Sequence, residues 1–443
     1  MNNFDVIQPS SLTANEVSIS DSDRRRALFG SAVGSTIEWY DYFLYGTMSS
    51  IVFAELFFPS TDALRSQLLA LASFALAFLI RPLGGIFFSH VGDRIGRKKT
   101  LAITLSMMGL STVLMGLIPT YSQIGVWAPI TLTLLRLAQG FALGGEWGGG
   151  VLLAVEYSPA TRRGFYGAVP QTGGLLGLAL GNIITSALTS SMSREAFISY
   201  GWRIPFLASI VLVAVGIWVR NRVDETPSFK KILSSHKAVK LPLVRTLKYH
   251  WREVLIAVGT KVVEASTFFL YATFSVSYMI GLGYAKSQAL NVVLLGATLA
   301  LPAMLLFGHL SDRFGRRRVF VLGVLAFIVW VMPYFWLLNQ HSLPAAILAV
   351  VAGFALVWSS YGALIGTLLA EAFPSTVRYT GISLGYQIGA ALVGGPMALI
   401  ATALIAHYGG SYVPVCFFLI GCGILSIISV ALTRDRTGHE LDD

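Results

Sequence analysis

The segment HVGDRIGRKK, residues 90–99, is matched by HLSDRFGRRR, residues 309–318, later in the same chain. Two further pairs of segments repeat in the same order and at nearly the same separation. They are EYSPATRRG (156–164) with EAFPSTVRYTG (371–381), and Glu38 followed by FLY (43–45) with Glu264 followed by FLY (269–271). Three ordered matches indicate an internal repeat, so we expect two homologous halves.

The composition indicates a membrane protein. Of the 443 residues, 55% are hydrophobic and only 12% are charged, which is unlike an ordinary water-soluble domain. Because a spanning helix needs about 20 mostly apolar residues, we predict twelve such helices and an all-α, polytopic membrane fold. The expected spans are 27–56, 67–91, 100–118, 127–157, 164–190, 203–220, 253–280, 287–309, 319–338, 344–372, 379–407 and 411–433.

The distribution of basic residues predicts the orientation in the membrane. The chain has a formal net charge of +10 and 32 Lys and Arg residues, and assigning alternate loops to one side places 25 of them there. Loops rich in Lys and Arg stay in the cytoplasm, so we expect a protein of the bacterial inner membrane with both termini on the cytoplasmic side. The positive charge therefore reports topology, and we expect no nucleic-acid partner. The first 23 residues lack the apolar segment of a signal peptide, so we expect none to be removed.

The repeat divides the chain into five parts. Six expected spans form an N-terminal bundle, residues 27–220, and six form a C-terminal bundle, residues 253–433. A linker at 221–252 is rich in Lys and Arg and suits a position near anionic lipid headgroups. Cytoplasmic tails at 1–26 and 434–443 complete the chain. Two parallel repeats around a central pathway are typical of secondary transporters.

The repeated loops predict a gate. Each places an aspartate, Asp93 or Asp312, among arginines, next to glycines that permit a tight turn. Such an aspartate can bind basic groups and a helix N-terminus in one access state and release them in the other. A charged turn with no further role is the alternative, but the second copy favours a symmetric gate. The residues assigned to it are Gly92, Asp93, Arg94, Gly96, Arg97, Glu156, Arg163, Asp312, Arg313, Arg316, Glu371 and Arg378.

These motifs resemble the major facilitator superfamily, whose members carry G-x-x-x-D-R-x-G-R-R between spans two and three. More narrowly, the sequence is similar to the metabolite:proton symporter family, which includes bacterial shikimate, α-ketoglutarate, citrate and proline/betaine carriers. GGEWGG looks most like the shikimate-type branch. The resemblance implies functional roles for Arg81 and Arg203. Its segments are EWYDYFLYG (38–46), FLIRPLGG (78–85), GDRIGRKK (92–99), RLAQGFALGGEWGG (136–149), YGWRIPF (200–206) and DETPSF (224–229), denser in the first half than in the second.

Acids inside the expected spans are the candidates for proton coupling. A charge at mid-bilayer costs about 2.5–3.5 kcal/mol on insertion scales, so such residues normally face a cavity or a partner. Glu38 and Asp41 lie three positions apart on one helical face, where mutual repulsion and burial favour a proton on at least one of them. We assign the coupled proton first to Asp41, then to Glu38, with Glu146 as a further candidate. Permanent pairing with an arginine is the alternative.

Bases inside the expected spans are the candidates for binding an anion. Arg81 opens RPLGG in the second span, and a guanidinium there can hold a carboxylate through two hydrogen bonds. Arg136 begins the R-x-x-Q-G sequence of the fourth span, and its alternative role is helix packing. Lys261 and Glu264 are also three positions apart and are expected to neutralise each other. The first span thus has two acids where the seventh has an acid and a base, so we assign proton handling to the N-terminal half.

Aromatic and polar side chains on spans one, five, seven, ten and eleven are expected to line the pathway. For each tyrosine, packing or a position at the lipid interface is the alternative, and Tyr386 belongs to the same group. With the arginines, the predicted substrate-binding residues are Arg81, Arg136, Tyr42, Tyr45, Gln171, Asn182, Arg203, Tyr271, Trp358, Tyr361 and Gln387.

Other function classes find little support in the sequence. It contains no Walker A motif, which argues against direct use of ATP, and no nucleophile–base pair or metal cluster that would indicate an enzyme. We therefore predict a monomeric, lipid-embedded, proton-coupled symporter without a cofactor, which imports a shikimate-like acid or another mono- or dicarboxylate by alternating access. A symporter of a zwitterion such as proline or betaine, and a facilitator or antiporter on the same fold, are the alternatives. The substrate and its proton stoichiometry stay open.

Overall fold

The computed structural model describes residues 20–60, 63–222, 225–226, 242–439 and 441, and every regular element within them is a helix. Most of the expected N-terminal tail and part of the expected linker lie outside the described residues. The first helix begins earlier than expected, at Asp21, because Ser20 caps it. The Ser20 hydroxyl accepts a hydrogen bond from the Asp23 amide at 3.1 Å, and acids in a first turn suit the helix dipole.

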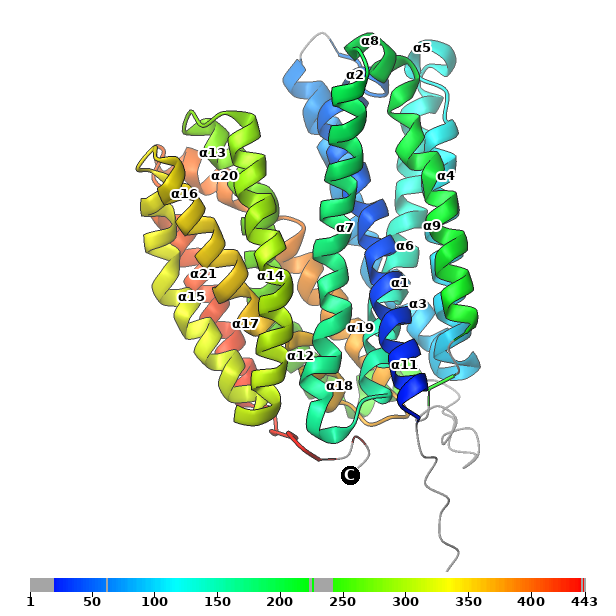
Figure 1. Cartoon of the computed structure of the whole chain (residues 1–443), viewed down its shortest axis with the longest axis vertical. Coiled ribbons are helices and arrows are strands. Elements are labelled where there is room, and N and C mark those ends of the chain that lie inside the picture. Colours follow the sequence, from blue (N-terminus) through cyan, green and yellow to red (C-terminus); the bar gives the residue numbers. More distant parts are fainter. Residues whose placement is uncertain (1–19, 61–62, 223–224, 227–241, 440, 442–443) are drawn as a thin grey trace, which may run out of the picture.

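The first half of the chain folds as a bundle of long helices joined by short turns (Figure 1). Its elements are α1 (Asp21–Met48), η1 (Ser49–Phe53), α2 (Ala54–Leu56), α3 (Ala63–Ile95), α4 (Arg97–Leu117), α5 (Tyr121–Ile124), α6 (Trp127–Glu156), η2 (Ala160–Arg162), α7 (Arg163–Ser191), α8 (Arg194–Ala196), η3 (Phe197–Gly201) and α9 (Arg203–Asn221).

The second half repeats this plan, with more interruptions of the long helices by short π-type segments. Its elements are α11 (Pro242–Tyr249), α12 (Trp251–Phe269), η4 (Leu270–Phe274), α13 (Ser275–Gly281), α14 (Lys286–Phe314), α15 (Arg316–Leu338), α16 (Leu343–Val350), η5 (Val351–Trp358), α17 (Ser359–Gly362), α18 (Ile365–Ala372), α19 (Arg378–Gly389), η6 (Ala390–Gly394), α20 (Met397–His407) and α21 (Val413–Ala431).

Ten helical stretches in the described part of the chain are long and apolar enough to cross a membrane. The helices α1 and α6 fall short of that measure, and they carry the acids at positions 38, 41 and 146. Both are nevertheless of spanning length and pack inside the same bundle, α1 along α7 and α6 along α3. With these two, the structure is consistent with the twelve predicted spans.

The two most extensive contacts between the halves are related to each other by the repeat. Helix α14 packs along α7, and α3 packs along α19. Since α3 and α14 both precede the repeated loop, and α7 and α19 both follow the second repeated segment, each contact is the counterpart of the other. The halves come together at the end of the molecule near the C-terminus and stand apart toward the opposite end (Figure 1).

Glycines allow the closest helix approach within the first half. A Cβ atom placed on Gly84 would lie 1.8 Å from the carbonyl oxygen of Phe141, and one on Gly144 would lie 2.2 Å from that of Arg81. Any side chain at either position would therefore separate α3 from α6. This packing explains the glycines of RPLGG and GGEWGG, because small residues are what let helix backbones meet in a membrane.

The predicted turns of the repeated loops are confirmed. Gly96 and Gly315 adopt φ angles of 108° and 93°, which disfavour residues with a side chain. Each glycine separates two long helices, α3 from α4 and α14 from α15. We call the end of the molecule that carries these two turns the basic end.

Candidate functional site

A small cavity of about 30 Å³ lies between the two halves, with room for one or two water molecules. Both halves contribute to its wall, so it lies where a rocking motion would expose it. From the predicted set, Arg81, Gln171 and Trp358 line it, as does Tyr386. The full lining is Trp39, Phe78, Arg81, Gln171 and Gly174 from the first half, and Lys261, Glu264, Ala265, Phe268, Phe269, Trp358, Tyr386 and Ala390 from the second.

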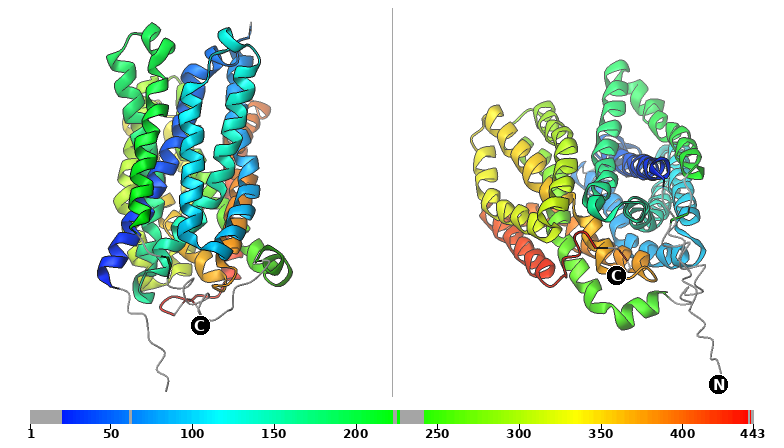
Figure 2. Two further views of the ribbon diagram at one scale, coloured as in Figure 1. Left: turned by 90° about the vertical axis from the view of Figure 1, so that its right-hand side faces the viewer. Right: turned by 60° about the horizontal axis from the view of Figure 1, so that its bottom comes forward.

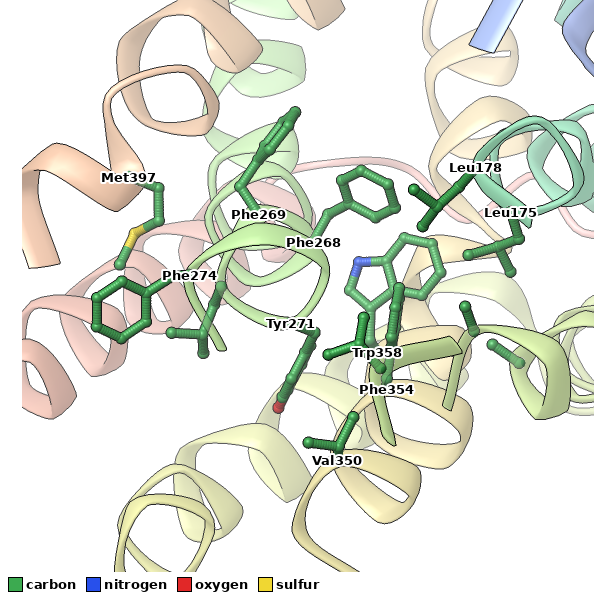
Figure 3. Packing of buried hydrophobic residues seen from close by; sticks show 14 of the residues in the cluster. Leu175, Leu178, Phe268, Phe269, Tyr271, Phe274, Val350, Phe354, Trp358 and Met397 are labelled. Atoms are coloured by element: carbon green, nitrogen blue, oxygen red, sulfur yellow. The ribbon is translucent and has the colours of Figure 1, made fainter. Parts of the chain in front are cut away.

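Aromatic rings from opposite halves meet around this cavity and keep it small. The ring centroids of Trp39 and Phe268 are 5.9 Å apart, and those of Phe78 and Phe269 are 5.2 Å apart. Figure 3 shows Phe268 and Trp358 on the side that faces Leu175 and Leu178 of α7. A substrate larger than a few atoms needs these side chains to move apart.

Arg81 presents a free donor to the cavity. Its side chain is 1% exposed, and its Nε donates a hydrogen bond to Oε1 of Gln387 in the other half at 2.9 Å. One terminal nitrogen has no hydrogen-bond partner among the described residues, and no carboxylate there forms an ion pair with it. A buried guanidinium with an unused donor is a ready site for an anion.

Gln387 and Gln171 hold the polar side of the cavity in place. The Gln387 amide nitrogen donates to the carbonyl of Gly144 at 2.8 Å, which leaves its oxygen for Arg81. Gln171 accepts from the indole nitrogen of Trp147 at 3.1 Å. The Trp147 ring in turn stacks on Tyr386, with centroids 3.4 Å apart. Residues that span both halves therefore fix the orientation of the groups in the cavity wall.

The predicted internal pair of the second half is confirmed. Lys261 and Glu264 form an ion pair through Nζ and Oε2, and their side chains are 3% and 8% exposed. The Lys261 Nζ also lies 3.7 Å from the centroid of the Tyr386 ring, a cation–π distance. Both members of the pair line the cavity.

Arg136 lies inside the first half and does not line the cavity. Its guanidinium carbon is 4.4 Å from the ring centroid of Tyr42, 4.3 Å from that of Tyr45 and 4.8 Å from that of Phe74. It also donates a hydrogen bond to Gln139. Aromatic faces thus surround this charge in place of a counter-ion, and Tyr42 and Tyr45 contribute two of these faces.

The two acids of α1 occupy different surroundings. Asp41 is fully buried and accepts a hydrogen bond from the Ser209 hydroxyl at 2.6 Å, and no base among the described residues forms an ion pair with it. Glu38 is 1% exposed, and Arg81 and Arg220 are the cations that act on it. Among the described residues, neither acid forms an ion pair with Arg81 or Arg136. The alternative of permanent pairing is therefore not supported.

Glu146 has a partner that sequence reasoning missed. It forms an ion pair with Arg220, at the end of α9, and accepts a hydrogen bond from Thr104. In the sequence, Arg220 ends the expected span 203–220 beside the basic linker, but its side chain is only 4% exposed and also contacts Leu101 and Gly34. The signal that could have found it is the need of a buried Glu146 for a nearby cation.

Four other predicted substrate residues lie away from the cavity lining. Arg203 donates to the carbonyls of Gly116 and Ile118 at 3.2 and 2.9 Å, which caps the end of α4. Tyr361 donates to Thr267 at 2.9 Å inside the second half. Tyr271 stacks with its neighbours there, and Asn182 is half-buried on α7.

The first gate cluster consists of Asp93, Arg97, Glu156 and Arg378, all buried at the basic end. Arg97 lies 3.9 Å from Asp93 and 3.2 Å from Glu156. Glu156, in the first half, is also 3.4 Å from Arg378 of the second half. The cluster therefore ties the two halves together.

The second gate cluster, Asp312, Arg316, Glu371 and Arg163, repeats this arrangement with the halves exchanged. Arg316 lies 3.2 Å from Asp312 and 3.1 Å from Glu371. Glu371, in the second half, is 2.9 Å from Arg163 of the first half. Of the other predicted gate residues, Arg94 and Arg313 are exposed and stay outside both clusters.

Each loop aspartate also caps a helix of the opposite half. Asp93 accepts hydrogen bonds from the amide and hydroxyl of Thr380, at 3.2 and 2.8 Å, at the start of α19. Asp312 accepts from the amides of Gly164 and Phe165, at 2.7 and 2.9 Å, at the start of α7. A carboxylate at a helix N-terminus is stabilised by the helix dipole. Gly92 leaves room for the Tyr379 ring, because a Cβ atom on Gly92 would lie 2.2 Å from that ring.

Segments beyond each bundle cap the helices that follow the turns. Glu225 accepts from the backbone amides of Arg97 and Lys98 at 3.1 and 3.2 Å. In the second half, Thr437 accepts from the amide of Arg316 at 3.2 Å. The sequence motif DETPSF gains a structural role from the first of these contacts.

The C-terminal segment also binds the gate arginines and runs beneath both halves (Figure 2). Its carbonyl at His439 accepts from Arg163 at 3.0 Å, and its carbonyl at Leu441 accepts from Arg378 at 2.9 Å. It therefore contacts both gate clusters while the basic end is closed.

A second and larger cavity, about 500 Å³, lies in the second half between α14, α15 and the η5–α17 stretch. Its lining is apolar except for Arg318 and Ser360, and it contains exposed residues such as Phe314 and Leu322. A hydrophilic substrate would gain little there, so we assign the transport site to the smaller cavity. Among the described residues, no group of three or more His, Cys, Asp or Glu side chains could hold a metal ion.

The sequence matches the family model described as Major Facilitator Superfamily over residues 32–394. The chain belongs to the major facilitator superfamily. This confirms the predicted fold class and superfamily, and the protein is a multi-pass membrane transporter of a small molecule, not an enzyme.

Curated relatives place the chain among metabolite transporters, as predicted. It is 37% identical to the shikimate transporter of Escherichia coli (strain K12), over 95% of this chain and 97% of that protein. It is 32% identical to the proline/betaine transporter of Salmonella typhimurium (strain LT2), over 96% of this chain and 87% of that protein. Among solved structures, the MFS proton:xylose symporter XylE bound to 6-bromo-6-deoxy-D-glucose has a TM-score of 0.75 and 16% identity, and covers 95% of this chain and 98% of its own. At that identity the likeness shows the fold alone.

Proposed function

We propose that this protein is a proton-coupled symporter that carries a small organic acid through the cavity between its halves. The observation that carries the proposal is the free donor of Arg81, because a buried cation without a counter-ion is costly and an anionic ligand removes that cost. A carboxylate can accept two hydrogen bonds from one guanidinium. The similarity to a shikimate transporter favours the same class of substrate. The proton gradient drives accumulation without a cofactor.

Asp41 is the proposed site of the coupled proton. It is buried beside a hydroxyl donor and has no ion-pair partner among the described residues. A carboxyl group in such surroundings is stable when neutral and becomes costly to keep charged, so changes in access to water would load and unload it. Both Arg81 and Arg220 act electrostatically on Glu38. Through Arg81, Glu38 links this proton to the substrate site.

The basic end is the proposed cytoplasmic side. Its excess of Lys and Arg fits the positive-inside rule, and the bacterial relatives fit an inner-membrane location. Both gate clusters are closed there, so the conformation is one in which the cytoplasmic path is shut. Rocking of the halves would separate Glu156 from Arg378 and Arg163 from Glu371 and open that path. One chain contains the whole pathway, and we propose a monomer.

A zwitterion such as proline or betaine is the second candidate for the substrate. The cavity wall contains a carboxylate, Glu264, and two tryptophans, Trp39 and Trp358. Aromatic faces and an acid attract a quaternary ammonium group, and one of the relatives is a proline/betaine transporter.

Uptake into proteoliposomes tests the proposal. Purified protein is reconstituted with an acidic outer buffer, and accumulation of radiolabelled shikimate, a dicarboxylate or glycine betaine is measured. We expect accumulation of a carboxylate that collapses with a proton ionophore, and a loss of roughly 100-fold in Arg81→Gln, which removes a charge-assisted contact. The exposed Arg94→Gln variant should transport like wild type. Uptake that is unchanged by the ionophore, or preserved in Arg81→Gln, overturns the proposal.

A further inference from the structure

The Lys261–Glu264 pair has a position that no other buried ion pair shares. The gate clusters lie at the basic end, and Glu146 pairs with Arg220 inside the first half. Among the buried ion pairs of the described residues, only Lys261 and Glu264 line the cavity. They face Arg81, which the opposite half contributes to the same wall.

Glu264 is held more loosely than the acids of the gate. Asp93 and Asp312 each accept hydrogen bonds from backbone amides in addition to their arginines. In the described part of the chain, the carboxylate of Glu264 has one hydrogen-bond donor, the ammonium group of Lys261. Another carboxylate that entered the cavity could take its place without breaking any other contact.

Lys261, in contrast, is held firmly where it can receive a ligand. Its Nζ lies over the Tyr386 ring at 3.7 Å, and Tyr386 is stacked on Trp147. Close packing of α12 on α19 fixes its stem, since a Cβ atom on Gly389 would lie 2.7 Å from the Lys261 Cβ. Contacts other than Glu264 therefore hold the ammonium group, namely the Tyr386 ring and the packing of α12 on α19.

We propose that Lys261 is a second substrate-binding cation, which Glu264 occupies until the carboxylate of the substrate displaces it. This inference rests on the function proposed above, and the proton that Glu264 gains is additional to the one proposed on Asp41, which is bound before the substrate. The displaced Glu264 carboxylate gains one proton from water and becomes a carboxylic acid, while Lys261 stays an ammonium ion and the substrate stays a carboxylate. A carboxylate that loses its only cation in a dry cavity is costly unless it is neutralised.

Charge balance supports this exchange. The cavity wall carries two cations, Arg81 and Lys261, and one anion, Glu264. A monocarboxylate that enters with one proton on Glu264 leaves the total charge of the site unchanged. Entry of the acid without the proton would place two carboxylates in the same small cavity, where they repel each other, so substrate and proton favour each other's binding.

The same exchange determines the class of substrate. Once Glu264 is neutral, Arg81 and Lys261 both face the ligand, and the two oxygens of one carboxylate can bridge them. A fixed positive charge on the ligand would then meet two cations and no anion. The site therefore selects small acids without a fixed cation over zwitterions such as glycine betaine.

Other titratable groups surround the pair and set its response to pH. Arg81 of α3 lines the same cavity from the opposite half, Tyr386 of α19 lies against Lys261, and Glu38 of α1 acts electrostatically on Arg81 and Tyr386. Glu38→Gln must therefore be measured beside the variants of the pair, so that a proton bound at Glu38 is not attributed to Glu264.

Proton uptake during binding tests the exchange. Purified protein in weakly buffered detergent solution is titrated with shikimate, tryptophan fluorescence reports binding, and a pH-sensitive dye reports protons. We expect uptake of about one proton per shikimate and an affinity that falls up to about tenfold for each unit of pH above neutrality. Glu264→Gln should abolish that uptake and bind independently of pH. Glu253→Gln, a partly exposed acid on the same helix, should behave like wild type.

A second pair of variants separates binding from folding. Lys261→Met alone leaves Glu264 unpaired and can impair folding, whereas Lys261→Met with Glu264→Gln replaces the pair by neutral groups. We expect the double variant to fold and to bind shikimate at least about tenfold more weakly than Glu264→Gln.

The outcomes distinguish this inference from the function on which it rests. Unchanged proton uptake in Glu264→Gln, its loss only in Glu38→Gln or Asp41→Asn, or wild-type affinity in the double variant overturns the role of Lys261 and leaves the proposed symport intact. If neither shikimate nor a dicarboxylate binds wild type, the proposed substrate class is wrong and the exchange fails with it.

Discussion

The basic end and the central cavity differ in symmetry. At the basic end, each acid, arginine and capping contact of one half has a counterpart in the other, from Asp93 and Asp312 to Glu156 and Glu371. Deeper in the molecule, α1 carries two buried acids without an ion-pair partner among the described residues, and its counterpart α12 carries a closed ion pair that lines the cavity.

This difference shows which task constrains each region. A gate between two rocking halves opens along both interface contacts at once, so both copies of the motif are useful. A substrate and a proton lack two-fold symmetry, so the residues that hold them differ between the halves. The internal repeat gives each half a copy of the charged motifs, and the two copies remain alike only at the gate.

The largest effect is expected from a substitution among the acids of α1, in the asymmetric region. Asp41→Asn should abolish accumulation of substrate against a gradient but spare exchange across the membrane, because the amide cannot carry a proton yet keeps the size and the Ser209 hydrogen bond. Uptake and counterflow in proteoliposomes measure the two activities. Loss of both would assign Asp41 a folding role.

The next effect tests the symmetry of the gate. Glu156→Gln and Glu371→Gln should each destabilise the closed basic end by about 3–5 kcal/mol, because each removes the charge of a buried acid that two arginines share. Labelling of Ser383→Cys, a position buried behind the gate, measures the opening. The two variants should raise the labelling rate similarly, and the exposed Arg313→Gln should not. A large difference between the two variants would contradict functional symmetry.

A smaller effect is expected inside the first half. Arg220→Gln leaves Glu146 without its base and should lower thermal stability, whereas Arg220→Leu combined with Glu146→Leu should recover most of the loss, since buried pairs contribute little net stability. Thermal unfolding in detergent measures both variants. If the double variant is less stable than the single one, the pair has a stabilising role that its burial does not explain.

The smallest effects concern the helix caps at the two turns. Glu225→Ala and Thr437→Val each remove a side-chain cap and should cost about 0.5–2 kcal/mol. The labelling assay at position 383 should detect a slight and similar increase for both. No change in either variant would show that the turn glycines alone define these helix starts.

Much of the architecture could be predicted because its causes are local. The apolar runs, the turn glycines and the repeated motifs each act within a few residues. The pairing of Lys261 with Glu264 was predictable for the same reason, since three positions on one helix bring them together.

The partners of the other charges depend on contacts between distant segments. Gln387 beside Arg81, Arg220 beside Glu146 and the aromatic faces around Arg136 come from different helices, so spacing along the chain could not indicate them. Arg203, which the sequence suggested for substrate binding, caps the end of α4 instead.

The sequence by itself determined that this chain crosses a membrane many times, as two related halves with paired charged loops, because hydropathy, charge and repetition are properties of short segments. Only the tertiary structure decided which buried charges neutralise each other and which stay available to a ligand. The reason is that a charge in a dry interior is governed by the groups within a few ångströms, and packing of the helices alone brings those groups together.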